Sequence, residues 1–326
     1  MLSRKLILLL IISTTLFAEY KNCEFKKPHY TEICKKVVQK GVPVHNANLF
    51  LLSRKTEDLD LLSYKFFHPS KIKQHRENEK KANNVLVKYV PKIVTHVKKY
   101  KKIYDEAEKR YGVNREIVAA ILMKETKLGD IKPRFDAFRV FNTLVVKVKP
   151  TTSRDKWLLN MGKSNLVSVI AYCYKKGYTP SQCNLPSSYA GAVGIPQFMP
   201  SSFVYIDSYK SKVGDLTKME DAIMSASKFL HKKAGFSKLI EWGKIPEMSK
   251  VEADWYEYDF NHKNGSFVYS ESKRTGKKYD CFSCGKEELQ YLKGYAKYIM
   301  RYNNSSNYAI GVMRLAYDTH KGLTKR

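Results

Sequence analysis

Apolar residues recur at helical spacing along much of the chain, most clearly over residues 114–128. At about 100° per residue, one face of this segment collects five apolar side chains, Ile117, Val118, Ile121, Leu122 and Leu128. Asn114 is of a type that caps helix N-termini, and Gly129 follows the last apolar position, as glycine often does at helix ends. The pattern therefore predicts one amphipathic helix with its apolar face in the core.

Glu125 interrupts that apolar face. It lies four residues beyond Ile121, inside the stripe, whereas Glu116 and Lys127 are predicted to point toward water and Lys124 lies at the stripe's edge. Burial disfavours the charged form of a carboxyl group, so we expect Glu125 to have a raised pKa, as a general acid needs near neutral pH. A structural glutamate that pairs with an arginine or caps a loop would occupy the same position, and position alone leaves both interpretations open.

The wider pattern predicts a mainly α protein of the α+β type. Residues 104–236 read as successive helices broken by Gly and Pro loops, and residues 287–319 as helix broken around Asn303–Ser306. Between them, residues 240–286 alternate aromatic and turn residues, which favours a small β-hairpin or an irregular segment.

The region before residue 100 is basic and polar. Helices are predicted over residues 30–41 and from residue 83 onward, the second interrupted at Pro91 because proline cannot donate a helical hydrogen bond. Residues 1–18 combine two basic residues, a short apolar run and a small final residue, which is typical of a cleaved signal peptide. The run from Leu6 to Ile12 is too short for a membrane anchor, so we expect export to the periplasm.

The six cysteines fall into three local groups. For an exported chain they predict disulfides, and proximity in sequence favours Cys23–Cys34, Cys173–Cys183 and Cys281–Cys284. The last pair could instead be half a zinc site or a redox motif, although no second ligand pair stands at metal spacing.

The formal net charge of +28 predicts an anionic partner. Nucleic acid would be the default for a cytosolic protein, but for an exported one the charge favours cell-wall polymer or an anionic membrane surface.

Two further segments have the chemistry of a ligand cleft. In SSYAGAVGIPQFMPSS, residues 187–202, small residues allow close backbone approach and Gln197 can both donate and accept hydrogen bonds. In MRYNNSSNYAIG, residues 300–311, Tyr302 and Tyr308 could stack on sugar rings, and Asn303 offers an amide. Alone, each segment could equally be an ordinary tight loop or a helix–turn–helix contact.

Together with Glu-Thr-Lys-Leu-Gly at 125–129, these segments resemble the membrane-bound lytic transglycosylase B family over roughly residues 100–320. The resemblance implies a lysozyme-like fold and an exported enzyme that cleaves peptidoglycan. It makes Glu125 the single catalytic acid and base, and assigns contacts with the bound sugars to Ser188, Gln197, Tyr302, Asn303 and Tyr308. With the signal-peptide pattern and the basic composition before residue 100, the chain is predicted to comprise a signal peptide (1–18), a basic helical region (19–100) and a lysozyme-like transglycosylase domain (101–326).

The chain departs from the family pattern at three places. IDSYKSKVGDLTKMED, at 206–221, lacks the alternating Asp/Asn ligands of a calcium loop, so we predict no metal and no cofactor. Phe229 stands where a tyrosine is usual, and residues 139–157 show no clear match to the family's paired arginines.

We therefore predict a monomeric lytic transglycosylase that forms 1,6-anhydro ends on peptidoglycan strands. Other cell-wall enzymes or an anionic membrane surface are further candidate partners, and nucleic acid is not expected. The three motif segments supply no second carboxylate beside Glu125. A lysozyme-type hydrolase on the same fold and a catalytically silent wall-binding protein remain the alternatives.

Overall fold

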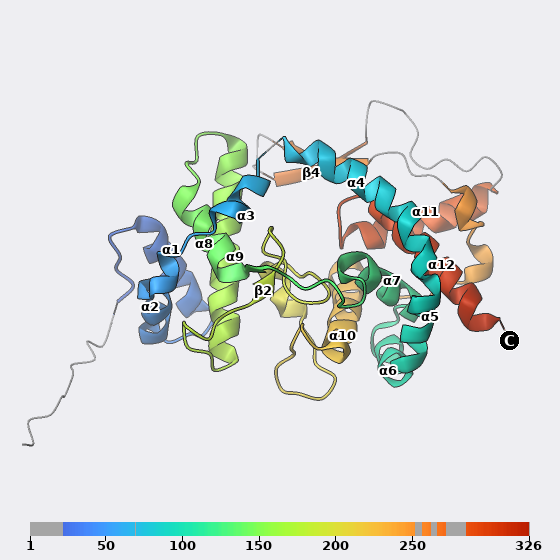
Figure 1. Ribbon diagram of the computed structural model, residues 1–326, viewed down its shortest axis with the longest axis horizontal. Coiled ribbons are helices and arrows are strands. Elements are labelled where there is room, and N and C mark those ends of the chain that lie inside the picture. The colour runs from blue at the N-terminus through green and yellow to red at the C-terminus, as the bar shows by residue number, and fades with distance from the viewer. Residues whose placement is uncertain (1–21, 69, 252–255, 262–265, 272–284, 326) are drawn as a thin grey trace, which may run out of the picture.

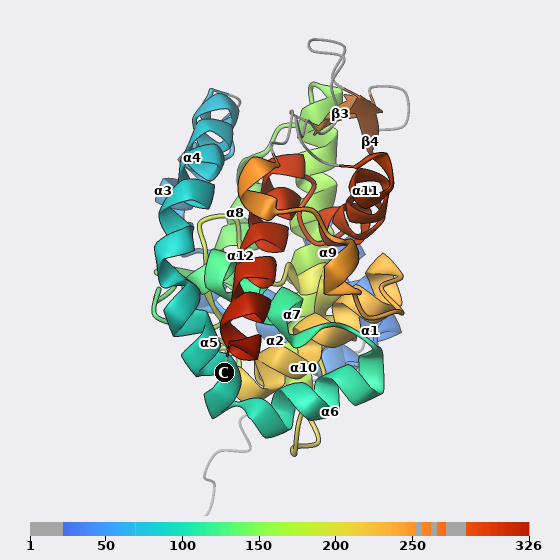
Figure 2. The same cartoon turned by 90° about the vertical axis from the view of Figure 1, so that its right-hand side faces the viewer.

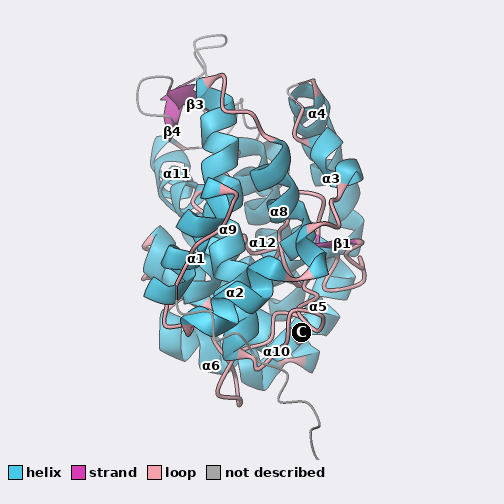
Figure 3. Ribbon diagram, turned by 90° about the vertical axis from the view of Figure 1, so that its left-hand side faces the viewer, coloured by secondary structure: helices cyan, strands magenta, loops and turns pink. Residues whose placement is uncertain are grey.

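The computed structural model describes residues 22–325, apart from residues 69, 252–255, 262–265 and 272–284. Helices dominate the described residues, and the named strands form two short pairs (Figure 3). The predicted mainly α class is confirmed. The α-helices are α1 (Pro28–Gln39), α2 (Val44–Leu52), α3 (Leu61–Phe66), α4 (Lys71–Leu86), α5 (Val90–Lys99), α6 (Lys101–Tyr111), α7 (Arg115–Thr126), α8 (Ala137–Lys147), α9 (Ser153–Lys175), α10 (Met219–Phe229), α11 (Lys286–Met300) and α12 (Ser306–Thr324).

Two hydrophobic clusters form the core. The α7 cluster is built mainly from buried residues of α5, α6, α7, α10, α11 and α12, with Leu86 of α4. The α9 cluster is built mainly from buried residues of α1, α2, α8 and α9 and the loop that follows, with Phe229 of α10. In Figure 1 the α9 cluster lies to the left and the α7 cluster to the right, and α4 runs above the gap between α3 and α5. Tyr302 packs against both clusters, so the turn before α12 lies at their junction.

Helix α7 is surrounded rather than half-buried. Helices α5, α6, α10 and α12 all contact it, as Figure 2 shows around its axis. The prediction that Glu116 points toward water is therefore wrong, because its side chain is buried and its Oε1 lies 3.0 Å from Nδ1 of His320 on α12. The helix also ends earlier than predicted, at Thr126. Lys127 follows with a left-handed backbone, partly buried, and its Nζ lies 5.4 Å from the centre of the Tyr89 ring.

Several local predictions are confirmed. The long helix is interrupted by a 3-10 turn at Val87–Tyr89, just before Pro91, which occupies the first turn of α5 where its missing N–H costs nothing. Strands β3 (Tyr256–Asn261) and β4 (Ser266–Glu271) form the predicted hairpin.

Disulfides join Cys23 to Cys34 and Cys173 to Cys183, as predicted. The proposed pair Cys281–Cys284 and the signal peptide lie outside the described residues. Within the described part of the chain, no helix combines the length and apolar character that crossing a membrane requires.

Candidate active site

Glu125 lies near the C-terminal end of α7, in the interior but with part of its side chain accessible to solvent. Its Oε1 accepts a hydrogen bond of 2.6 Å from the hydroxyl of Tyr308. Burial raises the pKa of Glu125 to about 7; the Tyr308 hydrogen bond and the charge of Lys124 act in the opposite direction, and the charge of Glu79 adds to the rise. Around neutral pH the group can therefore both hold and release a proton, as an acid–base catalyst must.

Tyr308 is placed by the N-terminus of α12. Ser305 is the N-cap, and its Oγ accepts from the backbone N–H of Tyr308 at 3.1 Å. The ring of Tyr308 is only 3% exposed. In this structure its hydroxyl therefore contacts the acid itself, and its faces are covered by protein.

The loop between β2 (Pro186–Ser187) and the 3-10 helix Pro200–Tyr205 lies beside Glu125. The hydroxyl of Thr126, the next residue, donates to the carbonyl of Ile195 at 2.9 Å, and the hydroxyl of Tyr302 donates to the carbonyl of Pro196 at 2.6 Å. The two motif segments predicted from sequence are thus brought to the end of the glutamate helix by direct hydrogen bonds.

Within the loop, Gln197 and Ser188 also bind the backbone. Gln197 has a left-handed backbone (φ 51°), and its Nε2 donates to the carbonyl of Gly194 at 2.9 Å. The Oγ of Ser188 accepts from the N–H of Ala192 at 3.2 Å. Both side chains are partly exposed. Among the hydrogen bonds between described residues, the side-chain oxygen of Gln197 accepts none and the hydroxyl of Ser188 donates none.

Asn303 lies in the turn between α11 and α12, where it is exposed, and its neighbour Tyr302 is partly buried. The ring of Tyr302 packs against the ring of Phe229, with the two ring centres 4.9 Å apart at an interplanar angle of 61°. Phe229 is 5% exposed and also packs on Phe198, in the loop between β2 and the 3-10 helix Pro200–Tyr205. Phe229 is therefore a buried residue that packs against Tyr302.

Three residues at the site were not predicted from sequence to belong to it. Lys124 is on α7, and Glu79 and Asn83 are on α4. Asn83 Oδ1 accepts from the ammonium of Lys124 at 2.5 Å, and the hydroxyl of Ser305 donates to Glu79. These contacts span 41 and 226 residues of sequence and leave no signal in local periodicity, so only the tertiary structure could identify α4 as part of the site.

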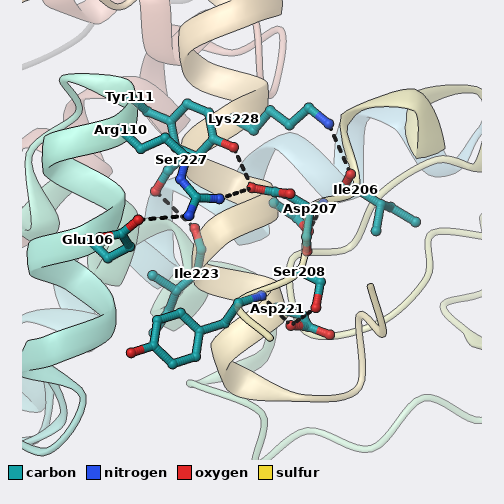
Figure 4. A network of polar contacts seen from close by, with 12 residues as sticks. Glu106, Arg110, Tyr111, Ile206, Asp207, Ser208, Asp221, Ile223, Ser227 and Lys228 are labelled. Carbon is teal, nitrogen blue, oxygen red and sulfur yellow. Dashed lines mark hydrogen bonds and ion pairs between the residues drawn. The ribbon is translucent and has the colours of Figure 1, made fainter. Parts of the chain in front are cut away.

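The 206–221 segment is organised by the protein's own donors (Figure 4). Asp221 accepts from the backbone N–H groups of Tyr209 (2.9 Å) and Asp215 (2.8 Å) and from Ser208 Oγ (3.0 Å). Asp207 accepts from Arg110 at 3.1 Å and from Tyr111. Since these donors already occupy the carboxylates, the residues do not fit a calcium ion, and no cluster of metal-ligating side chains occurs among the described residues.

The model of a family described as "Transglycosylase SLT domain" matches residues 28–317. No curated protein matches the sequence significantly.

Solved structures share the fold. Soluble lytic transglycosylase SltB1 from Pseudomonas aeruginosa has a TM-score of 0.60 at 20% identity, over 89% of this chain and 99% of that one. Escherichia coli lytic transglycosylase Slt35, solved with calcium, has a TM-score of 0.58 at 17% identity, over 92% and 95%. SltB3 from Pseudomonas aeruginosa, solved with NAG-anhNAM-pentapeptide, has a TM-score of 0.57 at 17% identity, over 87% and 76%. The lysozyme-like fold implied by the motifs is confirmed.

Proposed function

The chain belongs to the transglycosylase SLT domain family and is a lytic transglycosylase, and on this premise we propose that Glu125 is its single acid and base. The substrate is peptidoglycan, and the bond cleaved is the β-1,4 link between N-acetylmuramic acid and N-acetylglucosamine. The observation that carries this proposal is the buried carboxyl of Glu125, with a pKa near 7 and one oxygen held by Tyr308.

In the first step Glu125 acts as an acid. Because the Tyr308 hydroxyl donates to Oε1, the proton of the neutral carboxyl is on Oε2. That proton passes to the glycosidic oxygen while the bond from this oxygen to C1 of the muramic acid breaks. The sugar left behind carries positive charge at C1, and Glu125 becomes a carboxylate beside it.

In the second step Glu125 acts as a base. It takes the proton of the same sugar's C6 hydroxyl, and the C6 oxygen bonds to C1, closing a 1,6-anhydro ring. Glu125 regains its proton and water is not consumed. Glycoside hydrolases need a second carboxylate for a nucleophile or to activate water. Glu79, whose charge acts on Glu125, accepts a hydrogen bond from Ser305 at the start of α12, which supports a mechanism with one acid.

The remaining predicted residues would hold the glycan. Asn303 is exposed, and Ser188 and Gln197 are partly exposed beside the acid, so each has a polar group free to orient acetamido or hydroxyl groups. Tyr302 would present its ring at the junction of the two clusters, and Tyr308 would act on the sugar through Glu125. The complex of the structural neighbour SltB3 with NAG-anhNAM-pentapeptide supports a glycan ligand with a peptide stem.

We extend the proposal to location. Residues 1–18 direct export to the periplasm, where the wall substrate lies, and the net charge of +28 favours a peripheral position near anionic membrane or wall polymer. The enzyme would act there as a monomer, and its basic region 19–100 would supply the contacts to other wall components.

The proposal is tested by Glu125→Gln, with Glu116→Gln as the matched control from the same helix. We expect at least a thousandfold loss of peptidoglycan cleavage for Glu125→Gln, since an acid–base catalyst supplies about 10²–10⁴-fold and this one acts twice. Glu116→Gln, which alters a pair with His320 remote from the sugar contacts, should keep most of the activity. Cleavage retained by Glu125→Gln would refute the assignment.

Folding of the Glu125→Gln variant is checked by thermal unfolding at pH 8 and pH 4. The pKa of Glu125 is raised on folding, so its ionisation opposes folding increasingly from the unfolded value up to about pH 7. The glutamine variant should therefore be more stable than the wild type at pH 8 and close to it at pH 4.

A further inference from the structure

Helix α4 holds the N-terminal turn of α12 at two points. The hydroxyl of the N-cap residue Ser305 donates to the carboxylate of Glu79, and Nδ2 of Asn83 donates to the carbonyl of Asn307 at 2.7 Å. A carboxylate at a helix N-terminus is also favoured by the helix dipole. These contacts fix the turn that carries Tyr308, and with it the hydroxyl that binds Glu125.

The other polar atom of Asn83 holds a cation. Its Oδ1 accepts from Nζ of Lys124 at 2.5 Å, and the same ammonium lies 5.1 Å from the centre of the Tyr308 ring. Lys124 is the direct neighbour of Glu125 in sequence. Nevertheless, among the described ion pairs none joins Lys124 to Glu125 or to Glu79. The ammonium is bound to a neutral amide and an aromatic face, and the charges of Glu79 and, less strongly, Glu125 act on it from a distance.

The backbone makes room for this arrangement at Gly311. A Cβ at Gly311 on α12 would lie 2.0 Å from Oδ1 of Asn83 and 2.9 Å from Nζ of Lys124. Any larger residue would therefore displace the contact. Helices α4, α7 and α12 thus meet at a glycine, whose missing side chain leaves room for the amide and the ammonium.

We propose that Asn83 is a positioning residue of the active site, which binds the Lys124 ammonium and so keeps it from pairing with the carboxyl of Glu125. This inference rests on the proposed role of Glu125. If Lys124 paired with Glu125, the attraction would favour the carboxylate, and the enzyme would lose the protonated acid that begins the reaction. Part of the N-terminal region thereby belongs to the catalytic machinery.

Among the described residues, the groups that shift the pKa of Glu125 are Lys124 on its own helix, Glu79 on α4 and Tyr308 on α12. Tyr302, in the turn before α12, is in turn affected by Glu125, whose charge raises the pKa of its hydroxyl. On other faces of α7, the charged groups contributed by α6 are Asp105 and Glu108, which pair with Arg115 at the opposite end of the helix. On α5 and α10 the buried titratable groups have partners elsewhere: Nδ1 of His96 lies 3.3 Å from the hydroxyl of Tyr104 on α6, and Asp221 accepts from the 206–221 segment.

The test is the pH dependence of kcat/KM for peptidoglycan cleavage by the full mature chain carrying Asn83→Ala, with Asn84→Ala as control. Asn84 is the next residue on α4, exposed, and its side chain bonds Arg314 at 3.3 Å, away from Glu125. In Asn83→Ala the freed ammonium should pair with Glu125, moving the alkaline limb to lower pH by about one unit. This corresponds to a roughly tenfold loss at pH 8 with little change at pH 5. Asn84→Ala should follow the wild-type profile.

Three further variants separate a positioning role from a merely structural one. Gly311→Ala should reproduce the shift of Asn83→Ala, and Asn83→Asp, which keeps an acceptor for the ammonium, should leave the limb at or above its wild-type position. In a Lys124→Met background, Asn83→Ala should cause no downward shift, because the ammonium is absent.

A loss of activity that is uniform with pH, or the same downward shift in the Lys124→Met background, would overturn the role of Asn83. Those outcomes leave the proposed function intact as long as Glu125→Gln is inactive. Conversely, activity in Glu125→Gln would refute the proposed function itself, since the alkaline limb could not then belong to Glu125.

Discussion

At the scale of single residues, Glu125 is under opposing influences that leave its pKa near neutral. Burial and the charge of Glu79 favour the protonated form, whereas the hydroxyl of Tyr308 and the ammonium of Lys124 favour the carboxylate. The proposed mechanism needs both the protonated and the charged form in one catalytic cycle, and a pKa near 7 makes both forms accessible around neutral pH. The single hydrogen bond from Tyr308 is the strongest of the influences that lower the pKa.

Tyr308→Phe removes that hydrogen bond without removing the ring. The pKa of Glu125 should rise, because the bond stabilises the carboxylate, and the alkaline limb of kcat/KM should move to higher pH by up to about one unit. At the optimum the rate should fall about tenfold or more, since the acid is no longer oriented. A pH–rate profile measured beside Tyr317→Phe, a tyrosine of the same helix whose hydroxyl lies 3.4 Å from Glu247, checks this. An alkaline limb that stays in place would contradict it.

The sequence pattern located Glu125 correctly inside the protein but misplaced Glu116. The difference is physical. A stripe of apolar residues identifies one buried face, and α7 is covered on all sides because α12 packs over the side that carries Glu116. The second face is buried by a helix that is distant in sequence. The contact with His320 compensates the cost of burying the carboxylate of Glu116.

Among the structural elements, the loop between β2 and the 3-10 helix Pro200–Tyr205 is held by close backbone contacts. Gly194 has φ of 74°, and a Cβ there would lie 2.4 Å from Cβ and 2.6 Å from the carbonyl oxygen of Leu216. The N–H of Ile195 donates to that same carbonyl at 2.8 Å. The close backbone approach predicted for these small residues occurs at Gly194, against the turn at Leu216 that precedes α10.

Gly194→Ala should therefore be strongly destabilising. We expect a loss of about 2–4 kcal/mol in the free energy of unfolding, from a left-handed backbone and a clash with a backbone atom. Gly177→Ala is the matched control, because Gly177 also has positive φ (75°) but nothing lies within 4 Å of its Cβ position. It should lose only about 1–2 kcal/mol. Denaturant unfolding measures both, and equal losses would show that the contact with Leu216 contributes nothing.

The interruption before Pro91 and the hairpin of β3 and β4 were predictable from sequence because proline, turn residues and alternation act locally. The place of α4 beside the acid was not. Its side chains Glu79 and Asn83 meet residues more than two hundred positions away, and nothing in the polar composition of the region distinguishes them from solvated surface.

At the scale of the whole molecule, the acid lies where the α7 and α9 clusters meet. Each cluster draws buried residues from both sides of position 100, such as Ile33 and Ile170 in the α9 cluster and Ile93 and Ile117 in the α7 cluster. The family match, which begins at residue 28, covers the N-terminal helices as well. The region that looked like a basic extension in the sequence thus contributes to the core and to the proposed site.

The central claim is that one carboxyl group performs both proton transfers and that water takes no part. The most direct measurement is digestion of purified peptidoglycan by the mature enzyme in ¹⁸O-enriched water, with the products analysed by mass spectrometry. We expect muropeptides with 1,6-anhydro ends and no ¹⁸O at the cleaved bond. Reducing ends that carry ¹⁸O would contradict the claim, because they require a water molecule to attack C1 as in a lysozyme-type hydrolase.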